Sequence, residues 1–319
     1  MRIGVVGATG LVGGKMLSIM QQRRLAAPEQ VMAFASSGGR SVDYSGVKLP
    51  VKTLDPRMCE PGDYLLGATS SRIAAEWVEP CVEAGAVVVD NSSAFRMLDD
   101  VPLVVPEVNR RALSGHRGII ANPNCSTIQL VTAIAPILEE VDASWISVST
   151  YQAVSGAGGR ELERLRRQIS QRGGSRPLYY GNVLTEIGEP EPGGYCFEEL
   201  KLIHETAKIL GRAIPVFPAC ARVAVEVGHT ESVSMMLSRP LAASEALEIL
   251  ESAPGIALSR RGFTPVELAG SDIVGVGRVR NHPEEPRMLQ FWVTADNLRK
   301  GAALNAVQIL ECLLEDHRP

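Results

Sequence analysis

Short apolar runs alternate with amphipathic segments through the first third of the chain, and this alternation restricts the fold more than any other feature. The run "RIGVVGA" leads into a helical pattern over 10–23, and "YLLGAT" leads into a second one over 71–84. Strands that alternate with helices favour a parallel sheet with helices on its faces. The strands that we expect in this α/β region are "RIGVVGA", "VMAFAS", "YLLGAT", "AVVVDNS", "LVVPEV" and "RGIIANPN".

The pattern changes after residue 125 to that of a mixed α+β region. A helix over "STIQLVTAIAPILEEV" is expected first, and further helices are expected near 159–170, 198–210 and 242–252. Long runs such as "SWISVSTYQAV", "VAVEVGHTESVSMMLS" and "RMLQFWVTADN" predict a largely antiparallel sheet with helices against it. The final segment, "LRKGAALNAVQILECLLED", predicts an amphipathic helix that packs back onto the first region.

Composition excludes several classes of protein. The chain has 319 residues and a net charge of −4 with no basic cluster, so no nucleic-acid partner is expected. No apolar run approaches the ~20 residues that span a bilayer, and a strand pattern at the N-terminus leaves no room for a signal peptide. The six cysteines form neither a CxxC pair nor a metal-type spacing, which predicts free thiols, no metal site and a cytoplasmic location.

Three glycines, Gly7, Gly10 and Gly13, lie between the first expected strand and the first expected helix. This GxxGxxG spacing is a variant of the dinucleotide-binding pattern, in which a tight turn and a helix N-terminus face a pyrophosphate. The alternative is a glycine-rich turn that serves only helix–strand packing. We expect a dinucleotide to be bound by Gly7, Thr9, Gly10, Leu11, Val12 and Gly13.

The second expected strand ends in "SSGGRS", where an NAD site would have Asp or Glu to bind the ribose 2′-hydroxyl. Ser36, Ser37 and Arg40 stand there instead, and this set suits a 2′-phosphate. NADP is therefore favoured as the cofactor. The alternative for Arg40 is an ordinary solvated loop charge.

A single cysteine, Cys125, lies in "ANPNCSTIQLV", between a strand pattern and a helical pattern. The positive end of a helix dipole and the nearby backbone N–H groups favour the thiolate. With a nicotinamide cofactor, a thiolate can add to an aldehyde, and loss of hydride then leaves a thioester. The alternative is a small, buried and inert side chain.

His229 follows Gly228 at the edge of a strand-like run and is the candidate proton acceptor for this chemistry. Taken alone, His229 would more often be a hydrogen-bonded structural histidine. Arg222 lies seven residues earlier. On one strand this odd offset needs a twist or a bulge if both side chains are to face one site.

Seven short blocks occur in order from one end of the chain to the other: "GATGLVG", "DNSSAFRM", "ANPNCSTIQ", "QAVSGAG", "CFEELKLIHETAKIL", "RVAVEVGHTESV" and "RKGAALNAVQI". Together they resemble the bacterial aspartate-β-semialdehyde dehydrogenase family. The resemblance implies a Rossmann-type NADP-binding domain of residues 1–125 plus 299–319. It implies a catalytic and dimerisation domain of residues 126–298.

The resemblance also implies roles for individual residues. Three would take part in the chemistry: Cys125 as the acylated nucleophile, His229 as general base and acid, and Gln152 as the residue that orients the reacting centre. Five would bind the substrate: Arg222 its carboxylate, Glu198 its ammonium group, and Lys201, Arg96 and Asn91 its phosphate. Gly158 and Asn305 would lie at the nicotinamide end of the cofactor.

Ordinary structural explanations stay open for several of these residues. Glu198 and Lys201 are three apart on an expected helix and could be an exposed ion pair, worth only ~0.3 kcal/mol. Arg96 could be a surface charge, and Gln152 a polar residue on an edge strand.

The activity that the resemblance implies is NADPH-dependent reduction of β-aspartyl phosphate to aspartate semialdehyde and phosphate, by a homodimer or homotetramer. The first alternative is a reductase of the same fold that acts on another acyl group, such as N-acetylglutamyl phosphate or malonyl-CoA. Ala224 and Thr185, which stand where the family usually has proline, leave room for it, but Glu198 argues against it because neither substrate has a free ammonium group. The second alternative is a cofactor-binding paralogue without turnover, against which the full set of chemical residues weighs.

Overall fold

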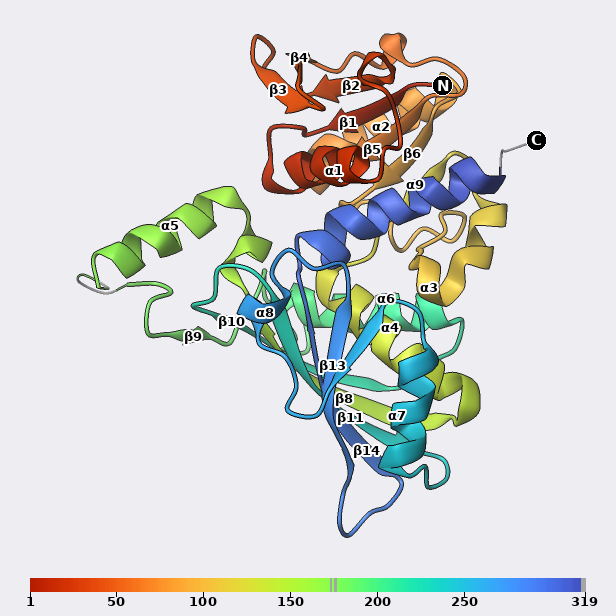
Figure 1. Ribbon diagram of the computed structural model, residues 1–319, viewed down its shortest axis with the longest axis vertical. Coiled ribbons are helices and arrows are strands. Elements are labelled where there is room, and N and C mark those ends of the chain that lie inside the picture. The colour runs from red at the N-terminus through yellow and green to blue at the C-terminus, as the bar shows by residue number, and fades with distance from the viewer. Residues whose placement is uncertain (173, 175–176, 317–319) are drawn as a thin grey trace. The chain divides into compact units, whose positions relative to one another are not determined.

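The computed structural model describes residues 1–172, 174 and 177–316. The chain divides into two compact units: the first consists of Met1–Asn124 and Ala302–Pro319, and the second of Cys125–Gly301. Among the described residues, no helix is both long enough and apolar enough to cross a membrane. The two units are described in turn below, with the elements labelled as in Figure 1.

The first unit is built on a seven-stranded sheet of order β3-β4-β2-β1-β5-β6-β7. Its strands are β1 Ile3–Val6, β2 Val31–Phe34, β3 Ser41–Tyr44, β4 Val47–Lys52, β5 Tyr64–Gly67, β6 Val87–Asp90 and β7 Ile119–Ala121. All neighbouring strands are parallel except β3, which runs antiparallel to β4 at the edge of the sheet. The predicted parallel α/β sheet is confirmed, and the β3–β4 pair is an addition to it.

One expected strand is absent from this sheet. The run "LVVPEV" makes only an isolated bridge between Leu103 and Ala121, and a short helix, α3 Pro106–Asn109, follows it. Proline has no N–H to donate to a neighbouring strand, and its fixed φ suits the first turn of a helix. Pro106 therefore ends the extended run and begins the helix.

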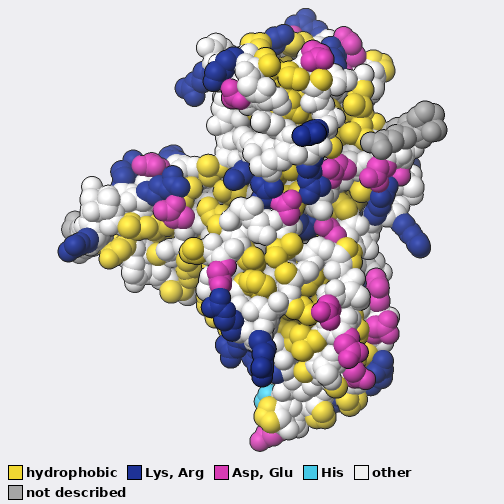
Figure 2. Space-filling model, viewed as in Figure 1, with side chains coloured by type: hydrophobic (Ala, Val, Ile, Leu, Met, Phe, Trp, Pro, Cys, Tyr) yellow, Lys and Arg dark blue, Asp and Glu magenta, His cyan; other side chains and the backbone are white. Residues whose placement is uncertain are grey.

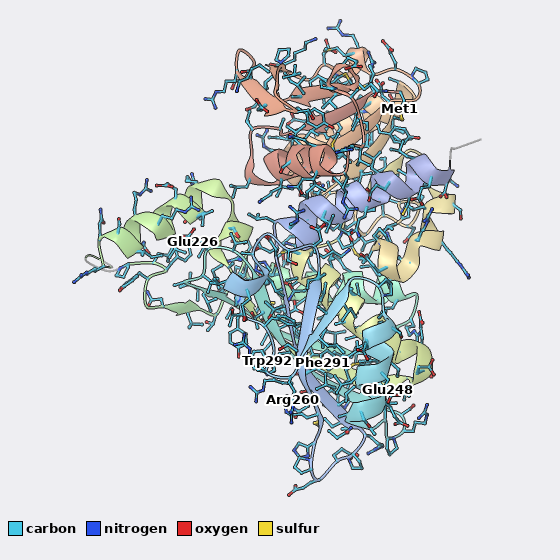
Figure 3. All side chains as sticks on the ribbon, viewed as in Figure 1. Met1, Glu226, Glu248, Arg260, Phe291 and Trp292 are labelled. Atoms are coloured by element: carbon cyan, nitrogen blue, oxygen red, sulfur yellow. The ribbon has the colours of Figure 1, made fainter. Side chains whose placement is uncertain are left out.

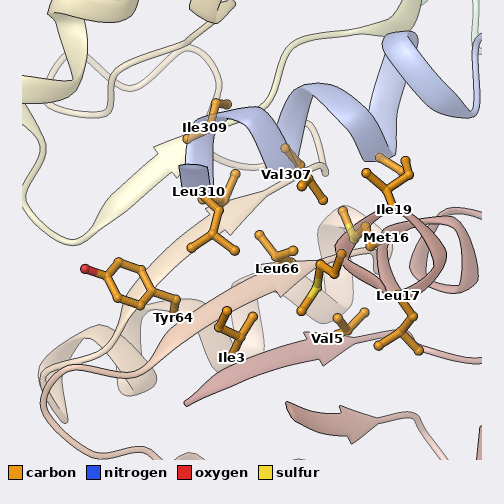
Figure 4. Packing of buried hydrophobic residues seen from close by; sticks show 14 of the residues in the cluster. Ile3, Val5, Met16, Leu17, Ile19, Tyr64, Leu66, Val307, Ile309 and Leu310 are labelled. Carbon is orange, nitrogen blue, oxygen red and sulfur yellow. The ribbon is translucent and has the colours of Figure 1, made fainter. Parts of the chain in front are cut away.

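The helices of this unit are α1 Leu11–Gln22, α2 Ser71–Glu83, α3 and α9 Leu304–Asp316. Two of these helices, α1 and α9, cover one face of the parallel sheet through a shared apolar core, part of which is drawn in Figure 4. Met16 and Ile19 on α1 pack with Leu66 on β5 and with Val307 and Leu310 on α9. The predicted return of the C-terminal helix to the first region is therefore confirmed.

The second unit is built on a seven-stranded mixed sheet of order β12-β13-β14-β11-β8-β10-β9. Its strands are β8 Ala143–Gln152, β9 Val183–Leu184, β10 Val216–Val223, β11 His229–Leu237, β12 Ile256–Ser259, β13 Val274–Asn281 and β14 Met288–Ala295. The β12–β13 and β8–β10 pairs are parallel and the other pairs are antiparallel, so the largely antiparallel sheet is confirmed.

The helices of the second unit are α4 Cys125–Glu140, α5 Gly159–Ser170, α6 Phe197–Leu210, α7 Ala243–Ser252 and α8 Pro265–Leu268. Three of them, α4, α6 and α7, share an apolar core with alternate residues of β8, β11 and β14. The remaining residues of these strands, such as Tyr151 and Trp292, lie on the opposite face. Phe291 and Trp292, labelled in Figure 3, are consecutive, and only Trp292 is partly exposed.

Helix α5 extends away from this sheet on the side of its edge strand, β9 (Figure 1). Its buried residues are Leu162 and Leu165, of which Leu165 packs with Val154 and Tyr179, and its other side is charged. Figure 2 shows basic and acidic side chains together on the upper side of this arm and hydrophobic ones along its lower edge.

The expected strand over "VAVEVGHTESVSMMLS" is wrong in its first part, because residues 224–228 form no strand and only the first residue of the run, Val223, belongs to β10. β10 ends at Val223 and β11 begins at His229, with Gly228 between them at a φ of +100°. A side chain at Gly228 would collide with Pro265, 2.8 Å from the built Cβ position. Only glycine adopts this φ readily in so tight a space. The chain therefore breaks here, and the two strands flank β8 instead of forming one strand.

The core of the first unit predicts a strong dependence on helix α9. Replacing the fully buried Leu310 with Ala should lower the free energy of unfolding by about 2–5 kcal/mol, because a cavity is left between α9, α1 and the sheet. Leu314→Ala, at a partly buried position on the same helix, is the matched control and should cost clearly less. Urea unfolding followed by circular dichroism measures both, and equal losses would contradict this packing.

Candidate active site

A cavity of about 660 Å³ lies in the first unit at the carboxyl ends of β1, β2 and β5. Among the expected cofactor residues, Gly7, Thr9, Gly10 and Ser36 line it. Helix α1 begins directly after Gly10, which provides no side-chain cap for the N–H groups of its first turn. Such N–H groups suit a pyrophosphate, so the cavity fits the phosphate end of a dinucleotide.

Other expected cofactor residues have different surroundings. A side chain at Gly13 would meet the Gly7 carbonyl oxygen at 2.2 Å, so this glycine permits close packing of the helix on the loop. Leu11 and Val12 are partly buried in the first turn of α1. Ser37 and Arg40 are exposed and are not among the lining residues of the cavity.

Several lining residues of the cavity were not identified from the sequence. Thr53, Leu54 and Pro56 follow β4, and Arg72, Ile73, Glu76 and Trp77 come from α2. No sequence pattern marks them, because the topology of the sheet brings their segments to the same edge as the glycine-rich loop. Branched and aromatic side chains of this kind suit the flat, apolar face of a base.

The second unit brings Cys125 and His229 into contact. Cys125 is the first residue of α4, partly buried, and His229 is the first residue of β11, fully buried. The Cys125 Sγ lies 3.2 Å from the His229 Nε2. The helix begins at the cysteine itself, so the thiol faces the N–H groups of the first turn, which favour its thiolate form.

The backbone of Ala153 determines which ring nitrogen of His229 carries the proton. Its N–H donates to the His229 Nδ1 at 3.0 Å. A ring nitrogen that accepts a hydrogen bond carries no proton, so the proton of the neutral ring lies on Nε2, which faces Cys125. In this arrangement His229 donates toward the sulfur instead of accepting a proton from it.

His229 stays neutral because of its surroundings. Burial, with the positive charge of Arg222 in support, lowers the pKa of the imidazole from 6.5 to about 3, although Glu198 opposes this shift. An imidazolium is therefore unavailable at neutral pH. The pair consists of a thiol or thiolate and a neutral hydrogen-bond donor.

Arg222 and Gln152 lie beside this pair on neighbouring strands. They are direct partners in the β8–β10 register, and both are buried. The Arg222 Nη1 donates to the Gln152 Oε1 at 3.2 Å and to the Ala153 carbonyl at 2.9 Å. Arg222 reaches the site from β10 and His229 from β11, so no bulge within one strand is needed.

Glu198 and Lys201 extend this network from helix α6. The Gln152 Nε2 donates to the Glu198 Oε1 at 3.2 Å, and the Lys201 Nζ donates to the Glu198 Oε2 at 3.0 Å. The Glu198 side chain is only 8% exposed and that of Lys201 20%. An exposed surface pair is therefore the wrong description, since one network joins both residues to Arg222.

Two glycines keep space around the reacting atoms, and neither was identified from the sequence. A side chain at Gly156 would lie 2.8 Å from the Arg222 Nη1 and 3.4 Å from the His229 Nε2. A side chain at Gly301 would lie 3.0 Å from the Cys125 Cβ. Gly301 belongs to a π-helical turn, Arg299–Ala303, of the kind that is frequent at functional sites.

The remaining expected residues have clear places within their own units. In the first unit Arg96 is buried and donates to the backbone oxygens of Asn122 and Asn91 at 2.9 and 2.7 Å, so it is not a surface charge. Asn305 is fully buried there, with its Nδ2 bonded to the Val104 carbonyl and the Asn122 Oδ1. Gly158, in the second unit, has a φ of +94° immediately before α5.

The chemistry that this site allows is nucleophilic attack by a thiolate beside a neutral donor. The sulfur can add to a carbonyl carbon, and the nearby Nε2–H can stabilise the oxygen that becomes negative. Arg222 and Lys201 provide positive charge for anionic groups of a ligand, and Glu198 provides negative charge. No group of metal-binding side chains was found among the described residues.

Known proteins resemble the chain along nearly its whole length. Residues 2–116 match the family model described as semialdehyde dehydrogenase, NAD binding domain, and residues 134–300 match that of the semialdehyde dehydrogenase dimerisation domain. The aspartate-semialdehyde dehydrogenase of Aquifex aeolicus is 40% identical over 99% of this chain and 98% of its own length. That of Prochlorococcus marinus is 39% identical over 98% of this chain and 95% of its own length.

Solved structures extend this likeness to three dimensions. The crystal structure of aspartate semialdehyde dehydrogenase II from Vibrio cholerae has a TM-score of 0.94 at 38% identity and covers 99% of each chain. The structure of the same protein complexed with ASA has the same TM-score, identity and coverage. The likeness therefore covers both units.

The low pKa of His229 predicts loss of stability in mild acid. In the unfolded chain the imidazole binds a proton below pH 6.5, whereas in the folded chain it does so only near pH 3. Between pH 7 and pH 5 the folded state should therefore lose about 2 kcal/mol through this one group. Urea unfolding at both pH values measures the loss, with His229→Asn as the control that removes the titration. An equal pH dependence in both proteins would contradict the assignment.

Proposed function

Because the chain belongs to the aspartate-semialdehyde dehydrogenase family, we propose that it reduces β-aspartyl phosphate to aspartate semialdehyde and phosphate with NADPH. The observation that carries this proposal is the contact between the Cys125 Sγ and the His229 Nε2, 3.2 Å apart at the start of a helix. The charged network of Arg222, Glu198 and Lys201 beside it suits an amino-acid acyl phosphate.

The cofactor is proposed to be NADP, held by the first unit. The family model for this region describes an NAD binding domain, and Gly7, Thr9 and Gly10 line its cavity. The loop after β2 has serine at 36 and 37 and no acidic residue that would favour a free 2′-hydroxyl. Arg40 is close to them in sequence and is the proposed partner of the 2′-phosphate. When bound, the nicotinamide supplies the hydride that reduces the acyl group.

The thiolate of Cys125 is proposed to attack the carbonyl carbon of the acyl phosphate. A carbon–sulfur bond forms, the carbon–oxygen bond to phosphate breaks, and a thioester remains on Cys125. The phosphate leaves with the electron pair and takes up the one proton that the net reaction consumes. The bound nicotinamide would supply the hydride that reduces this thioester, and release of the Cys125 thiolate would leave the aldehyde.

His229 is proposed to act through its Nε2–H. In the resting site this N–H stabilises the thiolate, and during both carbonyl additions it can donate to the oxygen that becomes negative. The accepting Nδ1 does not favour the general-base role that the family resemblance implies, because Nε2 already carries a proton. We therefore propose a hydrogen-bond donor in place of a general base.

The substrate is proposed to be bound by groups on either side of Gln152. A guanidinium group binds a carboxylate through two parallel hydrogen bonds, which suits Arg222 to the α-carboxylate. Glu198 would bind the ammonium group, and Lys201, Arg96 and Asn91 the phosphate. Glu198 is the reason to prefer an aspartyl group over an acylated amino acid or an acyl thioester.

The largely uncovered face of the second unit's sheet is proposed to bind a second copy of the chain. The short helix α8 lies against this face at β13, where Leu268 would meet a side chain at Gly275. The part of the face on β8, β10, β11 and β14 carries aromatic side chains between serines and threonines. Tyr151 stacks on Trp292 with ring centroids 5.9 Å apart, and Trp145 meets Phe217 edge to face. Phe217 is 53% exposed, and the family model of this unit is named for dimerisation. A homodimer or homotetramer results.

The reverse reaction tests the proposed activity. Enzyme, NADP and aspartate semialdehyde should form NADPH only when phosphate is present, because phosphate must release the thioester. NAD should be used less well, and N-acetylglutamate semialdehyde should have a kcat/KM lower by about 10² or more, since it offers Glu198 no ammonium group. Absorbance of NADPH follows each reaction. No NADPH from aspartate semialdehyde, with NADP binding intact, would refute the proposed substrate.

The same assay tests the nucleophile. Cys125→Ala should abolish NADPH formation and leave NADP binding unchanged, because Cys125 lies outside the first unit that forms the cavity. Cys312→Ala, at a buried cysteine of α9, is the matched control and should keep activity. Measurable turnover by Cys125→Ala would exclude the thioester route.

The sheet face predicts a change of oligomeric state. Phe217→Asp should reduce the molar mass in solution to that of one chain, because a charge would be buried between the two copies. Val266→Asp, on α8 at 84% exposure, is the control and should leave the mass unchanged. Light scattering after size exclusion measures both. An unchanged mass for Phe217→Asp would place the contact elsewhere.

A further inference from the structure

A second pair of polar side chains, Gln129 and Glu231, lies next to the pair of Cys125 and His229. Gln129 is four residues after Cys125 on α4, and Glu231 is two residues after His229 on β11. An offset of four on a helix and of two on a strand keeps side chains on one face. Helix α4 and strand β11 are in contact, so the second pair repeats the first, one step further into the core.

Glu231 is completely buried in an uncharged environment. Its neighbours in the sheet are Thr150 on β8 and Val293 on β14. Burial raises the pKa of its carboxyl group well above 4.5, and only the Gln129 side chain opposes this rise. No ion pair of Glu231 occurs among the described residues. Burial therefore favours the protonated form of the carboxyl group.

Gln129 and Glu231 have complementary hydrogen-bonding groups. Both are completely buried, and by strict geometry none of their four side-chain oxygen and nitrogen atoms has a hydrogen-bond partner among the described residues, the other member of the pair included. The Gln129 side chain is nevertheless close enough to Glu231 to act on its carboxyl group. A protonated carboxyl group and a primary amide each offer one donor and one acceptor to the other. Each can satisfy the other in the core, where unsatisfied polar groups are costly.

We propose that Glu231 is a positioning residue: its buried carboxyl group pairs with the Gln129 amide and ties strand β11, which begins at His229, to helix α4, which begins at Cys125. This pairing would join the same two elements whose first residues form the 3.2 Å contact. The pair controls the height and rotation of α4 over the sheet. The tie between the elements rests on the placement and burial of the two side chains, whereas its effect on turnover rests on the proposed function.

The effect on chemistry follows from the distance at the reacting pair. Catalytic groups displaced by about 1 Å can lose of the order of 10²-fold in rate. The Nε2–H of His229 stabilises the Cys125 thiolate only at hydrogen-bond range. Loosening the second pair should therefore raise the pH at which Cys125 becomes reactive, as well as slow turnover.

Alkylation of Cys125 by iodoacetamide, measured against pH by mass spectrometry, tests the proposal without any substrate. The other five cysteines are buried, and peptide mapping separates them from Cys125. Glu231→Leu should raise the midpoint of the alkylation profile by about one pH unit, the scale of a lost hydrogen bond to the thiolate. It should also lower kcat by about tenfold with little change in KM. Glu231→Gln, which keeps a donor and an acceptor, should keep the wild-type midpoint.

Two further variants separate positioning from packing. Val233→Ala removes a buried side chain from the same face of β11, so it should lower stability but leave the alkylation midpoint unchanged. Gln129→Leu should raise the midpoint as much as Glu231→Leu does. The double variant should add nothing further, because both residues act through one contact.

Distinct results would overturn the proposal. These are an unchanged midpoint in Glu231→Leu, an equal rise in Val233→Ala, or additive rises in the double variant. If Glu231→Leu does not fold, Gln129→Leu decides through the same measurement. A shifted midpoint without phosphate-dependent NADPH formation in the wild type would refute the proposed function and leave the positioning role in place.

Discussion

The backbone of Ala153 makes the two hydrogen bonds on which the site depends. Its N–H donates to the His229 Nδ1, and its carbonyl accepts from the Arg222 Nη1. One residue at the end of β8 thereby aligns side chains from the strands on either side of it. The N–H bond also places the histidine proton on Nε2, which faces Cys125. A backbone group has no rotamers to lose, so this alignment costs little conformational entropy and resists substitution of the side chain.

The charges around this centre follow a simple order. Lys201, Glu198, Gln152 and Arg222 form a chain of hydrogen bonds in which each anion or amide oxygen faces a donor. The cation nearest the ring, Arg222, lowers the pKa of His229 along with burial, and the nearest anion, Glu198, opposes it only partly. The imidazole therefore remains a neutral donor. It can donate a hydrogen bond to the thiolate without placing a second positive charge beside the Arg222 guanidinium. Deeper in the core, burial raises the pKa of Glu231 and so favours its uncharged form.

Much of the fold could be predicted because the local patterns were strong. Apolar runs alternated with helical periodicity through the first unit, and the bounds of α1 and α2 differ from those expected by one residue at most at each end. The prediction failed where local signals conflicted, as at "LVVPEV", where Pro106 begins a helix, and at Gly228, where a positive φ divides one apolar run into two strands. The β3–β4 pair was missed because its residues lie at the sheet edge and are largely exposed, which leaves little apolar periodicity to detect.

By itself, the sequence determined the residue types available for chemistry: a cysteine at a helix start, one histidine after a glycine, and glycines between the first strand and helix. The chemical roles that these residues suggest depend on short-range geometry, which their spacing in the sequence controls. Only the tertiary structure decided how they meet. Arg222 and His229 approach from opposite sides of β8, and Glu198 and Lys201 are buried against Gln152 instead of facing solvent. The proton position on His229 and the proposed pairing of Gln129 with Glu231 also depend on contacts between segments far apart in the chain. Sheet order and helix packing establish such contacts, so no local sequence pattern encodes them.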